Sequence, residues 1–178
     1  MPASRLLEPA PGRPLPHPRD RTAGICGFGR ALPTTVVDNA LIAERIGVDP
    51  AWITKRTGIS ARRRTIDGET LSELAIEAGG RALAVAGVGA AEVDAVLVAT
   101  SSADDIVPQA APIVAGALGC DRAMVWDVGL ACTGFLAGLQ QGAALIESGR
   151  ANSVLLIGAD VLGRYTDPDD RQTAALFG

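Results

Sequence analysis

The chain has 178 residues, which is enough for one domain with a hydrophobic core. Nearly half of the residues are apolar (48%) but only 3% are aromatic, so Ala, Val, Leu and Ile must supply most of the core. The net charge of −4 argues against a nucleic acid as the main partner. No apolar run approaches the roughly 20 residues that are needed to span a bilayer.

Neither the cysteines nor the N-terminus indicates a secreted or metal-binding protein. Cys26, Cys120 and Cys132 form no CxxC pair, so we expect no disulfide framework and no zinc site. The N-terminus lacks the apolar segment of a signal peptide. Residues 1–21 hold six of the 11 prolines and the only histidine, His17, and we expect a disordered tail there. These features together predict a cytoplasmic protein without a bound metal or cofactor.

The first third of the ordered chain predicts one strand followed by two short helices. Residues 22–28 are expected to form the strand and residues 29–33 the turn that leaves it. Asp38 or Asn39 can cap a helix that runs to about Ile46.

A second short helix begins at Pro50 and carries a tryptophan and an arginine four residues apart. At this spacing Trp52 and Arg56 share one helix face. They are compatible with a ligand site, or with a tryptophan anchored in the core beneath an arginine. Three consecutive arginines, 62–64, follow, and such a charge run is most often a solvated face. Beside a nucleotide site it would also attract anions, although no single arginine is assigned this role.

The remainder of the chain alternates between helical and strand patterns. Apolar residues at helical spacing predict helices, and short continuous apolar runs predict strands that are covered on both faces. The expected elements are a helix over 70–86, a strand over 93–99, a polar loop over 100–107, a helix over 108–118, and strands over 124–128 and 153–159 on either side of a helix over 132–148. This alternation predicts an α/β fold with a mostly parallel sheet and helices on both faces.

Cys132 stands at the junction between the strand over 124–128 and the helix that follows it. A thiol at a helix N-terminus lies near unpaired N–H groups and the positive end of the helix dipole, which favour the nucleophilic thiolate. A covalent acyl-enzyme is then possible. A buried structural cysteine is equally compatible with this position. The helix carries few charged residues, so we expect it to be buried on all sides.

Three separated stretches resemble β-ketoacyl-acyl-carrier-protein synthase III, a condensing enzyme of the thiolase fold. The first is Asp127 to Phe135, with its Ala-Cys-Thr-Gly-Phe core. The second is Gly24 to Arg64, including the run from Trp52 to Ile59. The third begins at Gly158 and continues through Arg164 to Gly178. They occur in co-linear order over residues 22–178, which is far more specific than one cysteine motif.

The resemblance implies a role for each candidate site residue. Cys132 would take an acyl group from acyl-coenzyme A, in the first step of a decarboxylative Claisen condensation with malonyl-acyl-carrier protein. Trp52 and Arg164 would enclose the adenine of coenzyme A, and Arg56 would lie beside its phosphates. Arg164 is equally compatible with a surface ion pair to Asp167, Asp169 or Asp170. Val107 matches a residue that reaches across a homodimer interface into the partner's acyl pocket.

The resemblance also implies a thiolase-like layered fold of which residues 22–178 are the N-terminal half. The family's catalytic His and Asn lie in the second half, so we expect this part to be incomplete at its C-terminal end. A second chain supplying that half is one explanation, and truncation or cleavage of a longer synthase is another. Two other functions remain open: an acyltransferase of the same fold that forms an ester or amide of a natural product, and a non-catalytic dimerisation partner.

Overall fold

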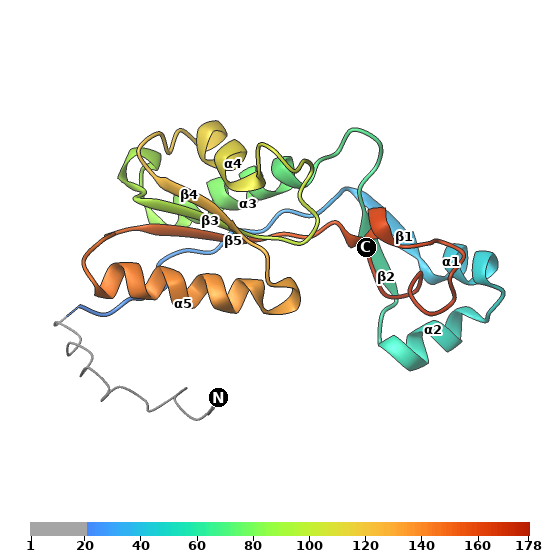
Figure 1. Cartoon of the computed structure of the whole chain (residues 1–178). Coiled ribbons are helices and arrows are strands. Elements are labelled where there is room, and N and C mark those ends of the chain that lie inside the picture. Colours follow the sequence, from blue (N-terminus) through green and yellow to red (C-terminus); the bar gives the residue numbers. More distant parts are fainter. Residues whose placement is uncertain (1–20) are drawn as a thin grey trace, which may run out of the picture.

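The computed structural model describes residues 21–178, and it has two regions (Figure 1). One, here called the layered region, consists of a parallel sheet between helices. The other, here called the small lobe, consists of two short helices, a two-stranded sheet and residues 166–178. The predicted tail and His17 lie outside the described residues, except for Arg21. Arg21 donates a hydrogen bond to Asn152 Oδ1 over 2.8 Å.

The sheet of the layered region has three parallel strands in the order β4-β3-β5. The central strand β3 (Ala95–Ala99) pairs with β4 (Met124–Val128) and with β5 (Val154–Gly158). Every residue of β3 is buried, as expected for a strand covered on both faces and flanked on both edges. The three strands fall within the predicted ranges.

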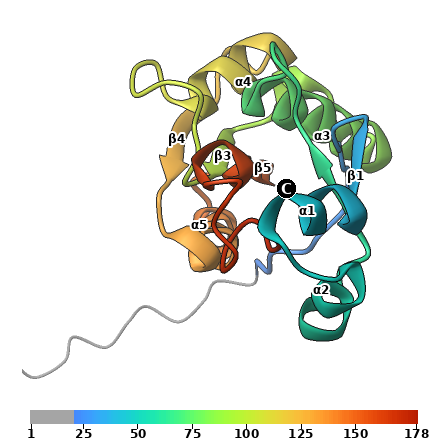
Figure 2. The ribbon, with the colours of Figure 1, turned by 90° about the vertical axis from the view of Figure 1, so that its right-hand side faces the viewer.

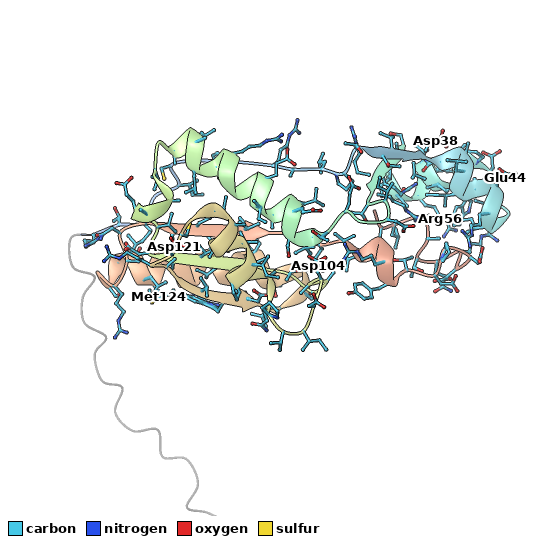
Figure 3. All side chains as sticks on the ribbon, turned by 90° about the horizontal axis from the view of Figure 1, so that it is seen from above. Asp38, Glu44, Arg56, Asp104, Asp121 and Met124 are labelled. Atoms are coloured by element: carbon cyan, nitrogen blue, oxygen red, sulfur yellow. The ribbon has the colours of Figure 1, made fainter. Side chains whose placement is uncertain are left out.

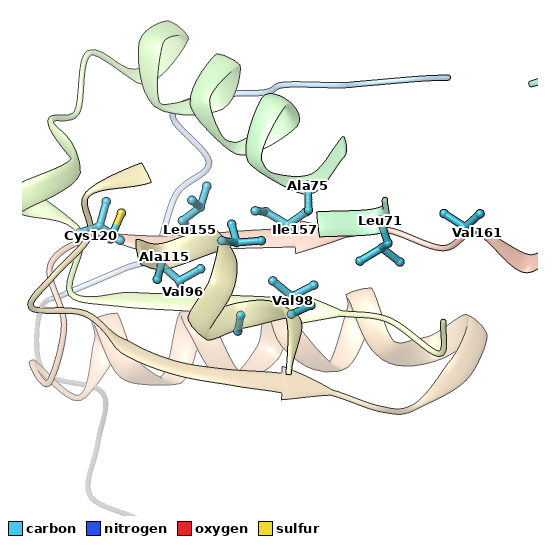
Figure 4. Close-up of a cluster of buried hydrophobic side chains, with 13 residues drawn as sticks. Leu71, Ala75, Val96, Val98, Ala115, Cys120, Leu155, Ile157 and Val161 are labelled. Atoms are coloured by element: carbon cyan, nitrogen blue, oxygen red, sulfur yellow. The ribbon is translucent and has the colours of Figure 1, made fainter. Parts of the chain in front are cut away.

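Helices cover both faces of this sheet, as the sequence pattern predicts. Helices α3 (Leu71–Ala86) and α4 (Ala110–Leu118) lie on one face and α5 (Gly134–Glu147) on the other (Figure 1). Between the sheet and the α3–α4 layer lies the largest aliphatic cluster (Figure 4). Its labelled members are Leu71, Ala75, Val96, Val98, Ala115, Cys120, Leu155, Ile157 and Val161.

Helix α5 rests on the sheet through its glycines. Gly134, Gly138 and Gly142 are buried, and a Cβ at Gly138 would come within 2.5 Å of Leu156 Cδ1. Away from the glycines the helix exposes large apolar side chains, with Phe135, which still contacts Gly158 of β5, at 48% and Leu136 at 65% exposure. The expectation that this helix is buried on all sides is therefore wrong for residues 21–178, because the side of α5 that faces away from the sheet is exposed.

The small lobe contains the two predicted short helices and a pair of strands that the sequence pattern missed. Helix α1 (Asn39–Ile46) is capped by Asp38, and helix α2 (Pro50–Thr57) is capped by Asp49. Strands β1 (Thr35–Asp38) and β2 (Ala61–Arg64) pair in antiparallel fashion. Figure 2 views the molecule from this side, with α1 and α2 toward the viewer.

The predicted strand over residues 22–28 is wrong. This segment pairs with no strand of the sheet. It packs on α3 instead. A Cβ on Gly29 would lie only 1.9 Å from Ala78 O, and one on Gly27 only 2.4 Å from Ala82 O, so only glycine allows such close backbone approach. A cavity of about 510 Å³ is lined by residues 23–29, α3, α5 and β5.

Short single-turn 3₁₀ helices complete the fold at Ala90–Glu92, Ala131–Thr133 and Leu162–Tyr165. Among residues 21–178, no helix is both long and apolar enough to cross a membrane. The same residues contain no group of three or more His, Cys, Asp or Glu side chains arranged to hold a metal ion.

Candidate active site

Cys132 is exposed in the 3₁₀ turn Ala131–Thr133 that joins β4 to α5. Helix α5 starts at Gly134, two residues later than the sequence pattern predicts. Ala131 has φ +45° and is the one non-glycine residue in the described chain with a positive φ. The backbone turns sharply here, immediately before the thiol, at a conformational cost of roughly 1–2 kcal/mol. A sharp turn of this kind presents the following side chain outward at the carboxyl end of the sheet.

Small residues and hydrogen bonds fix the connection between β4 and α5. A Cβ at Gly134 would lie 3.2 Å from Val128 O. Asp127, near the end of β4, accepts hydrogen bonds from Ala110 N at 3.0 Å and Ala111 N at 2.7 Å. This carboxylate therefore supplies partners to otherwise unpaired N–H groups at the start of α4. Strand β4 and helix α4 thus hold the peptide that leads into Cys132.

A second carboxylate joins the loops that follow β3 and β5. Asp160 Oδ1 accepts hydrogen bonds from Ser101 N at 2.8 Å and from Ser102 Oγ at 3.0 Å. Ser102 is only 1% exposed, and its hydroxyl also accepts a hydrogen bond from Val161 N at 2.7 Å. In parallel α/β sheets, ligands bind at the carboxyl ends of the strands. This network fixes the loops at that end, where Cys132 also lies.

The other two cysteines differ from Cys132 in their surroundings. Cys120 is buried, and burial together with the charge of Asp121 raises the pKa of its thiol, so it is poorly suited to act as a nucleophile. Cys26 is exposed in the extended N-terminal segment and lines the cavity beside α3. Among the described cysteines, only Cys132 combines exposure with a position at the start of a helix.

Trp52 lies in the small lobe, half-buried against the apolar cluster of α1 and α2. Two guanidinium groups lie over its ring: Arg56 at 4.7 Å and Arg171 at 4.9 Å from the ring centroid. Both distances are within the range of cation–π interaction. The predicted sharing of one helix face by Trp52 and Arg56 is confirmed. An aromatic ring beside two cations can bind a purine base and phosphates.

Arg164 has a different environment. Its Nη1 forms an ion pair with Asp104 Oδ1 at 2.7 Å, and its Nη2 donates to Glu69 O at 2.8 Å. Burial by itself would raise the pKa of Asp104, but the Arg164 guanidinium and the N–H groups of Ser72 and Leu71 outweigh it and lower this pKa to about 2. Figure 3 labels Asp104 at the junction of the two regions and Arg56 within the small lobe.

The position over Trp52 that the sequence resemblance gave to Arg164 is thus occupied by Arg171. The two arginines are seven residues apart in the same polar segment, so the motif alone did not distinguish them. The alternative expected for Arg164, a surface ion pair with Asp167, Asp169 or Asp170, is wrong, because Arg164 pairs with the largely buried Asp104 instead. Arg171 lies within the turn in which Asp170 Oδ1 accepts a hydrogen bond from Gln172 N.

Val107 is 84% exposed in the loop that precedes α4, next to Ile106 at 89% exposure. The structure thus brings Trp52 and Arg56 together with Arg171 in the small lobe. It places Cys132 at the carboxyl end of the parallel sheet, where α5 begins and faces the small lobe (Figure 1). Arg164 lies in the 3₁₀ turn Leu162–Tyr165 and bonds to Asp104 and to Glu69 O, beside the start of α3.

Comparisons with known proteins show which protein family this chain resembles. The family model of 3-oxoacyl-[acyl-carrier-protein] synthase III matches residues 126–178. A β-ketoacyl-[acyl-carrier-protein] synthase III from Granulibacter bethesdensis is 47% identical over 154 residues, which are 86% of this chain and 48% of that protein. A second such synthase, from Streptomyces coelicolor, is 44% identical over 88% of this chain and 47% of that protein.

Over most of its length, the chain matches the N-terminal half of a β-ketoacyl-acyl-carrier-protein synthase III. It spans about half the length of the curated relatives it matches.

Solved structures agree with this match. The 3-oxoacyl-(acyl carrier protein) synthase III of Pseudomonas aeruginosa is similar with a TM-score of 0.81 and 43% identity, over 89% of this chain and 48% of that one. The priming β-ketosynthase of the R1128 polyketide pathway has a TM-score of 0.86 and 34% identity, over 94% of this chain and 50% of that one. Both the resemblance read from the three motifs and the thiolase-like α/β fold are confirmed.

Proposed function

We propose that the protein is an acyltransferase of the synthase III type in which Cys132 accepts an acyl group from acyl-coenzyme A. The observation that carries this proposal is the exposed thiol of Cys132 on a sharp turn at the start of α5. The first N–H groups of α5 have no partner within the helix, and the helix dipole adds a partial positive charge. Both stabilise the thiolate and the oxyanion that forms when it attacks a carbonyl.

In the proposed step, Cys132 Sγ attacks the thioester carbonyl carbon as a thiolate. A new carbon–sulfur bond forms, the bond between that carbon and the coenzyme A sulfur breaks, and coenzyme A leaves as a thiolate. The proton that Cys132 released is returned to the leaving thiolate. The step exchanges one thioester for another and needs no oxidant, metal or cofactor.

The small lobe would bind the nucleotide end of coenzyme A. The adenine would be enclosed between Trp52 and Arg171, and Arg56 would lie close to the phosphates. Arg164, which the sequence resemblance placed at the adenine, would instead support the loop and helix beside the site through Asp104. Val107 would contact the acyl pocket of a partner copy in a homodimer.

The second reaction would be decarboxylative condensation of the bound acyl group with malonyl-acyl-carrier protein. It requires a His and an Asn, which would come from a longer form of this chain or from a second chain. Residues 22–178 would then be the N-terminal half of a thiolase-like domain. Transfer of the acyl group to an alcohol or amine of a natural product begins with the same acyl-enzyme, so the identity of the acceptor separates the two reactions.

Labelling with radioactive acyl-coenzyme A tests the first step. We expect one acyl group per wild-type chain, released by hydroxylamine as a thioester is, and none on Cys132→Ala. Cys26→Ala is the matched control, since it removes the other exposed thiol. Equal labelling of wild type and Cys132→Ala would contradict the proposal, and no labelling of either protein would favour the non-catalytic dimerisation partner.

A further inference from the structure

Arg62 on β2 is an unusual buried charge. Arg62 is only 7% exposed, and its two terminal guanidinium nitrogens donate hydrogen bonds to uncharged acceptors. Nη1 donates to Asn39 Oδ1 at 3.1 Å and Nη2 donates to Ala175 O at 2.8 Å, while Nε has no hydrogen-bond partner within the described structure. Burial, followed by the charge of Arg64, lowers the pKa of Arg62. A buried charge without an opposite charge costs stability, and an apolar side chain avoids that cost.

The two acceptors of Arg62 lie in different segments, and each segment leads to the Trp52 site. Ala175 is four residues after Arg171. It is 3% exposed and belongs to the apolar cluster of the small lobe. Asn39 begins α1, and its Nδ2 donates to Thr54 Oγ1 at 2.9 Å and to Ile59 O at 2.7 Å. The Arg62 guanidinium therefore connects the segment that carries Arg171, through Asn39, to the helix that carries Trp52.

The other polar link between these segments is weaker. Arg45 on α1 pairs with Asp169 through two hydrogen bonds, from Nε to Oδ1 at 2.6 Å and from Nη2 to Oδ2 at 3.1 Å. The two side chains are 54% and 65% exposed, and exposed pairs contribute little. The bonds of Arg62 are buried and directional, so they restrict the position of the segment more strongly.

We propose that Arg62 is a positioning residue for the Trp52 site: by joining Ala175 to Asn39 it holds Arg171 over the indole ring. This inference rests on the proposed binding of coenzyme A at Trp52. Arg62 itself does not touch the ligand. Its effect on affinity passes through Arg171.

The test compares Arg62→Met with Arg63→Met. Arg63 is the next residue on β2, but it is exposed and donates to the carbonyls of Pro33 and Thr34, so it is the matched control. Each change is made alone and together with Arg171→Met. Two readouts are used: acrylamide quenching of Trp52 fluorescence without ligand, in a Trp126→Phe background, and the dissociation constant of coenzyme A by calorimetry.

We expect Arg62→Met to raise the quenching of Trp52 to the level of Arg171→Met and to weaken coenzyme A binding roughly tenfold. Adding Arg62→Met to Arg171→Met should change neither readout further. Arg63→Met should match wild type. Arg62→Lys keeps the cation but cannot bridge both acceptors, so its values should lie between those of wild type and Arg62→Met.

Two results would overturn the proposal: unchanged quenching and affinity in Arg62→Met, or effects that add fully to those of Arg171→Met. If Arg62→Met does not fold, judged by circular dichroism, Arg62→Lys decides, and wild-type quenching in that variant would count against the proposal. Failure of the wild type to bind coenzyme A would refute the nucleotide site. The ligand-free quenching would still test the role of Arg62.

Discussion

The layered region and the small lobe are stabilised in different ways. In the layered region, β3 is fully buried between two helix layers, and its contacts are almost entirely aliphatic. In the small lobe, the apolar cluster has only five buried members, and a polar network from Arg62 through Asn39 supplements it. The nucleophile therefore sits on a rigid apolar scaffold, whereas the proposed nucleotide site depends on directional hydrogen bonds.

The largest loss of stability is expected for a substitution at the centre of the sheet in the layered region. Leu97 on β3 has no exposed surface, and Leu97→Ala should reduce the free energy of unfolding by about 2–5 kcal/mol through lost burial and the cavity left behind. Urea unfolding followed by circular dichroism measures this loss. Leu136→Ala, at 65% exposure on α5, is the same change at the surface and should alter stability by less than about 0.5 kcal/mol. Equal losses would mean that the layered region does not depend on its core.

A smaller and pH-dependent effect is expected where the two regions meet. The pKa of Asp104 is lowered to about 2, so its carboxylate stabilises the fold fully above the ordinary Asp pKa near 3.9. This contribution falls as the pH drops from about 4 through about 2. Asp104→Asn should therefore cost on the order of 2 kcal/mol at pH 7, and the difference from wild type should shrink toward pH 2.

Urea unfolding of both proteins at several pH values checks this prediction. Asp105→Asn, a neighbouring exposed residue, is the control and should follow wild type at each pH. A difference between Asp104→Asn and wild type that stays constant from pH 7 to pH 2 would show that the Arg164 ion pair is not its source.

Much of the layered region could be predicted from the sequence, because its signals are local. The apolar run of β3 and the helical spacing of α3, which Thr70 and Glu73 cap, mark the elements directly. The strand over 22–28 was predicted wrongly because the close packing of Gly29 on α3 is a tertiary contact. Strand β1 was missed because its four residues alternate weakly and pair with Ala61 and the three arginines of β2, which do not read as a strand.

Only the residues of the candidate site that lie in local patterns could be predicted, for the same reason. Cys132 was identified from the strand-to-helix junction together with a family motif, and Trp52 and Arg56 from helical spacing. Arg171 was missed because its contact with Trp52 joins residues 119 positions apart, and no local pattern separates it from Arg164. The support from Asp127 and Asp160 also arises only when distant loops meet.

The central claim is that the small lobe binds coenzyme A so that its thioester reaches Cys132. The most direct test measures the rate of Cys132 acylation, below saturation, by acyl-coenzyme A and by the matching acyl-pantetheine, which lacks the nucleotide. Trp52→Ala should lower the rate with acyl-coenzyme A by roughly tenfold and leave the rate with acyl-pantetheine unchanged, because only the first substrate contacts the ring. Equal loss with both substrates, or no loss with either, would contradict the claim.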